Sequence, residues 1–299
     1  MAKLLICDSV AAPAVEAMRA AGVTVDVRDT ITPEELLDVI AEYDAMVVRS
    51  RTKVRAPLID KATCLKVIIR GGVGLDNIDA GYAESKGIKV LNTPGASSNA
   101  VAELALGMMF ALARQLGRAD ATMKAGQWEK KTIKGVELAG KTLGVIGYGR
   151  IGRLLGEKAR ALGMKVVAYD PYVKHADIVS LEELLRVSDV VSMHLPHTDE
   201  SHNLLGAAQF AMLKRGAFVV QAARGGTLDE AALYDALVNG HLAGAALDVF
   251  SEEPPKSELL RKLVELPQVV ATPHIGAVTA EATEKIGDEI VALVREHLA

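Results

Sequence analysis

The chain has few aromatic residues, few cysteines and no long hydrophobic run. Of its 299 residues, only 4% are aromatic and two are cysteine. Cys7 and Cys64 lie in apolar sequence without C-x-x-C spacing, which excludes a disulfide framework and predicts buried, reduced thiols in a cytoplasmic protein. Because half of the residues are hydrophobic and so few are aromatic, the core must be packed mainly from Ala, Val, Leu and Ile.

Membrane and nucleic-acid partners are not expected. The longest apolar run, Leu104–Ala113, lies between Glu103 and Arg114 and is shorter than the about 20 residues that span a bilayer. The first eight residues include Asp8 and are predicted to form a strand instead of a signal peptide. A net charge of −4 offers no basic excess for a nucleic acid.

Several chemistries lack their motifs. No H-E-x-x-H, G-x-S-x-G or G-x-x-x-x-G-K-[ST] sequence is present, so zinc protease, serine hydrolase and P-loop functions have no support. His194 and His197 flank Pro196, which prevents a helix that would align them on one face. We therefore predict no metal site.

Short β-rich runs alternate with helical patterns in two stretches of the chain. This alternation predicts α/β architecture, with two Rossmann-like or flavodoxin-like doubly wound parallel sheets. The predicted strands of the first stretch are Lys3–Cys7, Val23–Val27, Ala45–Arg49, Lys66–Arg70 and Ile88–Leu91. Those of the second stretch are Thr142–Ile146, Lys165–Tyr169, Val187–His194, Ala217–Ala222, Ala243–Val249 and Val269–Thr272.

Helices are expected between these strands. Thr32 before Pro33, with Glu35 three residues after Thr32, is typical of a capped helix start. The turn formers of 92–99 predict an interdomain crossing. The other predicted helices are Ala11–Ala21, Pro33–Ala41, Ala56–Ala62, a long apolar helix from Val101 to about Ala125, and Ala280–Leu298, which we expect to return to the first domain.

The most informative motif is the G-x-G-x-x-G sequence at 147–152, which directly follows an apolar strand. Gly147 permits a tight turn, Gly149 lets the backbone approach a diphosphate, and Gly152 allows close packing of helix on strand. Glycine-rich turns are common, but here an amphipathic segment follows and a second strand ends at Asp170, near the expected spacing. The context predicts a dinucleotide site.

Three later strands end in reactive side chains: Arg224, Glu253 and His274. The carboxyl ends of strands in open α/β sheets bind ligands. Taken singly, each has an ordinary structural explanation. Arg224 could be a loop arginine that caps carbonyls, Glu253 a solvated acid and His274 a structural histidine. Together they supply a carboxylate clamp, an acidic partner and a proton carrier, as oxidation of a 2-hydroxy acid requires.

These motifs resemble the D-specific 2-hydroxyacid dehydrogenase family, and its members that oxidise 3-phosphoglycerate in particular. The resemblance runs over essentially the whole chain. The segments that carry it are 48–54, 70–79, 92–95, 127–129, 147–152, 223–226, 247–250 with 253–254, and 273–276.

The resemblance implies a substrate-binding domain of residues 1–93 plus 277–299, an NAD-binding domain of residues 94–276, and an active site in the cleft between them. It implies His274 as acid/base, Glu253 as its partner and Arg224 as substrate clamp. NAD contacts are expected from Gly147, Gly149, Arg150, Ile151, Gly152, Asp170, Leu195, Ala222, Ala223, Asp248, Gly276 and Ala277. Substrate contacts are expected from Arg49, Ser50, Gly71, Gly72, Val73 and Asn99, together with Arg224 and His274.

The resemblance also implies a homodimer through the helix near 101–125. Gln221 and Val73 depart from the residues common in the family, which puts their cofactor contacts in doubt. We expect no C-terminal regulatory domain after Ala299 and no serine feedback through one.

Substrate identity stays open. Arg49, Arg51, Lys53, Lys130, Lys131 and Lys134 could bind a substrate phosphate or could be solvated loop charges. A glyoxylate or hydroxypyruvate reductase would use the same redox residues without the phosphate. A nucleotide-sensing interaction protein, like the family's corepressors, is a third possibility.

Overall fold

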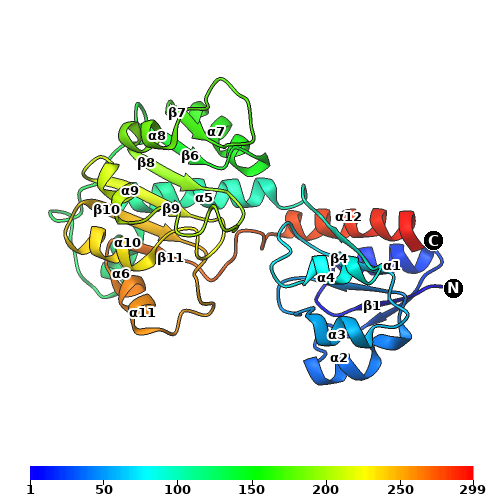
Figure 1. Ribbon diagram of the computed structural model, residues 1–299. Helices are drawn as coiled ribbons and strands as arrows, with labels where there is room; N and C mark the ends of the chain where they lie inside the picture. The colour runs from blue at the N-terminus through cyan, green and yellow to red at the C-terminus, as the bar shows by residue number, and fades with distance from the viewer. Residues whose placement is uncertain (299) are drawn as a thin grey trace. The chain divides into compact units, whose positions relative to one another are not determined.

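The computed structural model describes residues 1–298, which form two compact units. Unit 1 comprises Met1–Ser97 and the segment from Ala277 onward, and unit 2 comprises Ser98–Gly276. The first boundary therefore follows Ser97, a few residues beyond the predicted position after residue 93. Figure 1 shows that both units place helices around a parallel sheet.

Unit 1 has a five-stranded parallel sheet in the order β2-β1-β3-β4-β5. This is the flavodoxin-like strand order. The strands are β1 (Lys3–Ile6), β2 (Thr24–Val27), β3 (Ala45–Val48), β4 (Val67–Arg70) and β5 (Lys89–Asn92). The helices are α1 (Ala12–Ala20), α2 (Pro33–Val39), the 3₁₀ turn η1 (Ile40–Glu42), α3 (Ala56–Lys61), α4 (Ala80–Ser85) and α12 (Ala280–Leu298). The sequence analysis did not predict α4.

Successive side chains along each strand point to opposite faces of the sheet, so the core of unit 1 has one part on each face. Leu4 and Ile6 pack with α1 and α12, while Leu5 packs on the opposite face with α2, α3 and α4. Figure 1 shows α12 beside α1, and the two helices are in contact. The predicted capping box is confirmed, since Thr32 Oγ1 accepts from Glu35 N at 3.2 Å and Glu35 Oε2 accepts from Thr32 N at 2.9 Å.

Unit 2 has a six-stranded parallel sheet in the order β11-β10-β9-β8-β6-β7. Counted from β6 as the first strand, the order is 2-1-3-4-5-6, so the direction of winding changes between β6 and β8. The carboxyl ends on either side of such a switch point are where doubly wound sheets bind ligands. The strands are β6 (Thr142–Ile146), β7 (Lys165–Tyr169), β8 (Val190–Met193), β9 (Ala217–Gln221), β10 (Leu242–Leu247) and β11 (Val269–Ala271).

The helices of unit 2 correct two predictions. The expected helix from Val101 to Ala125 is two helices bent by 65°, because Gln115 adopts the left-handed conformation with φ 50°. Val187 ends a helix instead of starting a strand. The helices are α5 (Ser98–Arg114), α6 (Leu116–Lys124), α7 (Arg150–Ala161), α8 (Leu181–Val187), α9 (Ala207–Met212), α10 (Glu230–Val238) and α11 (Glu258–Glu265).

Within residues 1–298, no single helix has the length and apolar character needed to cross a membrane, although the bent pair α5 and α6 meets that test jointly. Both cysteines are free thiols. Cys7 is buried as predicted, and burial raises the pKa of its thiol to about 12. Cys64 is exposed, so the prediction of burial was wrong for this residue.

Shortening a side chain on the buried face of α12 should destabilise unit 1. Ile290 is fully buried between α12 and the sheet, so Ile290→Ala is expected to lower the free energy of unfolding by about 2–5 kcal/mol. Urea denaturation measures this change. Glu284→Ala, an exposed change on the same helix, is the control, and equal effects of the two changes would contradict the packing described here.

Candidate active site

The three predicted reactive residues lie in unit 2, each after the carboxyl end of a strand. Arg224 follows β9, Glu253 follows β10 and His274 follows β11. These strands are consecutive neighbours in the sheet. Because parallel strands deliver their carboxyl ends to one edge, residues up to fifty positions apart in sequence reach the same edge of unit 2.

His274 and Glu253 form a direct pair. His274 Nδ1 lies 2.8 Å from Glu253 Oε2, and the other carboxylate oxygen of Glu253 accepts from Phe250 N at 3.2 Å. A carboxylate on Nδ1 fixes the orientation and tautomer of an imidazole. It leaves Nε2 for a ligand, and the side chain of His274 is 44% exposed.

The pair has an electrostatic consequence for the acid. Burial acts to raise the pKa of Glu253, but the hydrogen bond and charge of His274, the Phe250 N–H and the charge of Arg224 together hold this pKa below its usual value. Glu253 is therefore a carboxylate at neutral pH. The influence of Arg224 also indicates that the guanidinium lies within electrostatic reach of the pair.

A buried carboxylate holds the segment that carries His274. Asp248 is 2% exposed and accepts hydrogen bonds from Thr272 Oγ1 at 2.6 Å, Ile275 N at 2.8 Å and Gly276 N at 2.9 Å. Its carbonyl accepts from His274 N at 2.9 Å. These bonds support His274 in the left-handed conformation, with φ 54°, which a non-glycine residue adopts only where its surroundings impose it.

A second buried polar side chain holds the loop of Arg224. Gln221, 1% exposed, donates to Arg224 O at 3.0 Å and Thr227 Oγ1 at 2.6 Å and accepts from Ala223 N at 3.1 Å. Gly225 is required because a Cβ there would lie 1.9 Å from Phe250 O. This contact holds the Arg224 loop against the segment that leads to Glu253.

The glycine motif forms the turn between β6 and α7. Gly147 has φ 91°, and a Cβ on it would lie 2.6 Å from the backbone of His194; a Cβ on Gly152 would lie 2.2 Å from Gly147 O. A Cβ on Gly149 would meet no atom within 4 Å, so its surface is open to a ligand. Arg150 and Ile151 open α7, which has no side-chain cap, and its first N–H groups suit a diphosphate.

Asp170 lies beside this turn. Its two carboxylate oxygens accept from Tyr148 N and Tyr172 N, each at 2.9 Å. The acid thus joins the glycine loop to the end of β7 and keeps further lone pairs for ribose hydroxyls. The open surface of Gly149, the uncapped helix start and this acid together fit a dinucleotide.

The remaining predicted residues divide between the units. Leu195, Ala222, Ala223 and Gly276 lie in unit 2 after the ends of β8, β9 and β11, and Asn99 lies in the first turn of α5. Arg49, Ser50, Gly71, Gly72 and Val73 follow β3 and β4 of unit 1, where Ala277 begins the return segment. Most of these residues therefore follow strand ends, whereas Asn99 lies in a helix.

Sequence reasoning did not predict the buried ring of His194 or the supporting roles of Gln221 and Asp248. His194 Nε2 lies 2.8 Å from Ser192 Oγ, and its buried Nδ1 has no partner in the described chain. Burial lowers the pKa of His194 to about 4, so its ring is neutral at pH 7. The available signal was its position directly after β8, a mainly apolar strand with Ser192 as its one polar residue.

Comparison with known proteins gives concordant matches. Residues 106–276 match the family model "D-isomer specific 2-hydroxyacid dehydrogenase, NAD binding domain". The chain is 50% identical over 269 residues to a hydroxypyruvate reductase of Thermotoga maritima, covering 88% of that protein. It is 44% identical over 306 residues to a D-3-phosphoglycerate dehydrogenase of Methanocaldococcus jannaschii, of whose length it spans only 58%.

Solved structures agree with these matches. A D-lactate dehydrogenase of Aquifex aeolicus, crystallised with NAD and lactic acid, has a TM-score of 0.84 and 31% identity. The match covers 98% of this chain and 94% of that one. The predicted fold class and the predicted cofactor NAD are thereby confirmed.

The Glu253–His274 pair should make stability depend on pH. The pKa of Glu253 is lower in the folded protein than in the unfolded chain. Its ionised carboxylate therefore stabilises the fold at pH values above the unfolded-state pKa of about 4.3, and this stabilisation is lost as the pH falls through the folded-state pKa. Glu253→Gln should therefore destabilise the protein at pH 6, and the difference from the parent should shrink toward pH 3. Denaturant unfolding across this range measures it, with the exposed Glu284→Gln as control. A difference independent of pH would contradict the pairing.

Proposed function

Because the chain belongs to the D-isomer specific 2-hydroxyacid dehydrogenase family, we propose that it oxidises D-3-phosphoglycerate to 3-phosphohydroxypyruvate, the first step toward serine. The observation that carries the redox part is the His274–Glu253 pair at 2.8 Å, on the sheet edge that also carries Arg224. Loss of the hydroxyl proton and of the hydride on C2 turns the hydroxy acid into the keto acid.

We assign the chemistry as follows. His274 Nε2 removes the C2 hydroxyl proton, and Glu253 stabilises the resulting imidazolium through Nδ1. Arg224 offers a planar pair of donors to the substrate carboxylate. NAD, when bound, would supply the hydride acceptor. Asp248, Leu195, Ala222, Ala223, Gly276 and Ala277 are proposed to line the cofactor.

Asp170 supports NAD over NADP. A carboxylate at the ribose would repel a 2′-phosphate, and Pro171 and Tyr172, which follow it, provide no arginine to neutralise one. Arg150 and Ile151 are proposed to lie at the diphosphate, on the uncapped start of α7.

Unit 1 is proposed to supply the substrate contacts Arg49, Ser50, Gly71, Gly72 and Val73, and Asn99 joins them from α5. Arg49 is the favoured phosphate ligand in unit 1, because the structure gives its guanidinium no hydrogen bond or ion pair within residues 1–298. Arg51 is a poor candidate. Its guanidinium is already committed to Asp8 and three carbonyls.

Hydroxypyruvate reduction is the second candidate. The 50% identity to a hydroxypyruvate reductase over 88% of its length favours it, and the same three residues would serve the reverse reaction without a phosphate ligand. A nucleotide-sensing interaction protein is a weaker candidate, because Arg224, Glu253 and His274 are all present and two of them are paired.

One assay separates these functions. NADH or NADPH absorbance is followed with 3-phosphoglycerate, hydroxypyruvate and glyoxylate, and we expect NAD-linked turnover with the highest kcat/KM for the phosphorylated acid. His274→Ala should lower kcat roughly 10²–10⁴-fold. His241→Ala, at the amino end of β10, should leave kcat unchanged. Absence of turnover with all three acids would favour the interaction protein, and preference for hydroxypyruvate would favour the second candidate.

We also propose that the chain forms a homodimer, in the cytoplasm, through the region of α5 and α6. Helix α6 buries none of its residues within the chain. Leu116, Met123 and Trp128 are 51%, 56% and 77% exposed in and after it. Large apolar side chains grouped in this way are typical of an interface between copies.

Light scattering coupled to size exclusion tests this proposal. The parent chain should have about twice the mass of 31.7 kDa, and Met123→Glu should shift it toward the monomer because a buried unpaired charge is costly. Tyr172→Glu, which alters another exposed residue, is the control. A monomeric parent at micromolar concentration would overturn the proposal.

A further inference from the structure

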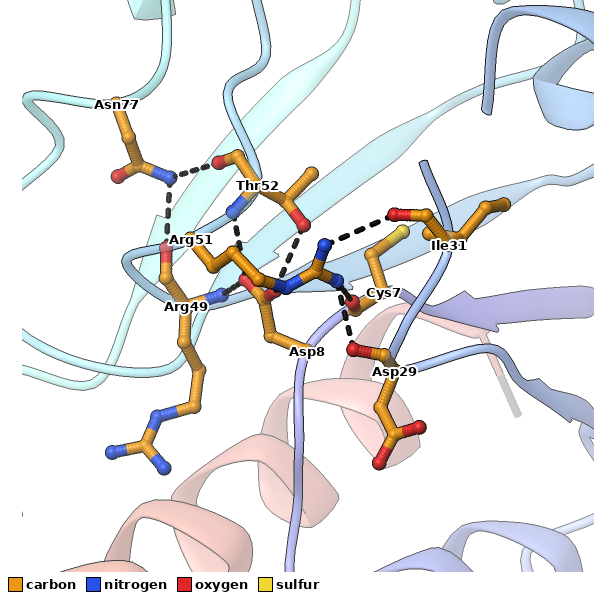
Figure 2. A network of polar contacts seen from close by, with 8 residues as sticks. All are labelled: Cys7, Asp8, Asp29, Ile31, Arg49, Arg51, Thr52 and Asn77. Carbon is orange, nitrogen blue, oxygen red and sulfur yellow. Dashed lines mark hydrogen bonds and ion pairs between the residues drawn. The ribbon is translucent and has the colours of Figure 1, made fainter. Parts of the chain in front are cut away.

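The loop that follows β3 in unit 1 is closed by two buried polar side chains. This loop, residues 49–52, carries Arg49 and Ser50. Asp8 lies just after β1, and Asn77 lies between β4 and α4. The two side chains are 4% and 5% exposed, and Figure 2 shows them on opposite sides of the loop.

Asp8 holds the loop by its N–H groups. Its carboxylate accepts hydrogen bonds from Arg49 N, from Thr52 N at 3.3 Å and from Thr52 Oγ1 at 2.8 Å. The same carboxylate forms an ion pair with Arg51 Nε at 3.0 Å. One buried acid therefore contacts both ends of the loop and a side chain between them.

Asn77 holds the loop by its carbonyl groups. Its Nδ2 donates to Arg49 O at 2.8 Å and to Thr52 O at 2.7 Å. Asn77 is itself fixed, because Val54 N donates to its carbonyl at 2.8 Å and Val54 pairs with Ile78 in a β-bridge. The N–H and C=O groups of Arg49 and Thr52 are thus all bound by just two side chains.

This arrangement gives the two arginines different tasks. The guanidinium of Arg51 donates to Ile31 O at 3.0 Å, to Asp29 O at 2.8 Å and to Cys7 O, so it ties the loop to the chain after β1 and β2. The side chain of Arg49 instead runs away from the network (Figure 2). Its stem lies against Gly71, where a Cβ would be 3.3 Å from Arg49 Cγ.

We propose that Asp8 and Asn77 are positioning residues for anion recognition: they set the backbone of 49–52 so that Arg49 faces the anionic group of the substrate. Arg51, in contrast, has a structural role, because its guanidinium is bound to the rest of unit 1. This inference rests on the proposed function for its substrate, but the clamp itself is a property of unit 1. A loop pinned at both ends delivers a guanidinium with little reorganisation, and a misplacement of about 1 Å can cost 10²-fold.

The decisive variant is Asn77→Asp, which keeps the shape of the side chain but sets carboxylate oxygens against two carbonyls. We expect KM for the hydroxy acid to rise about 10- to 100-fold, with kcat and KM for NAD within about two-fold of the parent. Asp8→Asn should also raise KM, because it removes the ion pair with Arg51. Asp44→Asn is the control, since Asp44 accepts from Lys3 N and Lys66 at the amino end of β3 in the same sheet.

Amide hydrogen exchange of residues 45–55 provides a readout that needs no turnover. Asn77→Asp should speed exchange at Arg49 and Thr52, whereas Asp44→Asn should not. If Asn77→Asp does not fold, Asn77→Ser removes the donor without adding charge and is measured in the same way. Unchanged KM and unchanged exchange in the folded variant would overturn the clamp. Faster exchange in a protein that turns over no hydroxy acid would support the clamp and overturn the proposed function.

Discussion

The arrangement of the candidate active site depends on the buried carboxylate of Asp248. It accepts hydrogen bonds from one hydroxyl and two backbone N–H groups of residues 272–276, and so fixes the segment after β11 to the end of β10. These bonds support His274 at positive φ, together with the bond that His274 N donates to Thr272 O at 3.0 Å. The contact between His274 and Glu253 is therefore a consequence of a bond network that lies beneath both residues. The residue proposed to react and the residue that sets its geometry are different, and the second is more deeply buried.

Polar side chains also support the loops at two other strand ends. Gln221 supports the loop of Arg224 through three hydrogen bonds, and Asp170 joins Tyr148 of the glycine turn to Tyr172. In each case a partly or fully buried polar side chain satisfies backbone groups that the end of a strand leaves unpaired. Parallel sheets bring reactive residues to a common edge, and these polar side chains then fix their direction.

The sequence was sufficient to predict most of the architecture, because strand runs such as Ala45–Val48 are buried throughout and read as continuous apolar segments. It also singled out Arg224, Glu253 and His274 as candidates, since each follows a mainly apolar strand, and their reactivity stays a prediction. The break at Gln115 was not predicted, although the apolar run of α5 ends at Ala113, because no glycine or proline marks the position where Gln115 takes the left-handed conformation. The short helix α4 was also missed, because six residues give too little periodicity. The support from Asp248 was hidden for another reason, as hydrogen bonds over more than twenty residues leave no local pattern.

The residues proposed for the redox step and those proposed for substrate recognition lie mainly in different segments of the chain. Arg224, Glu253, His274 and the glycine turn all belong to one uninterrupted segment, 98–276, whereas the residues proposed to recognise the rest of the substrate sit mainly on the other unit. Under the proposed function, sequence drift in the outer segments would alter substrate recognition and leave the segment with the proposed redox residues unchanged. Relatives named for lactate, hydroxypyruvate and phosphoglycerate are what such modular descent would produce.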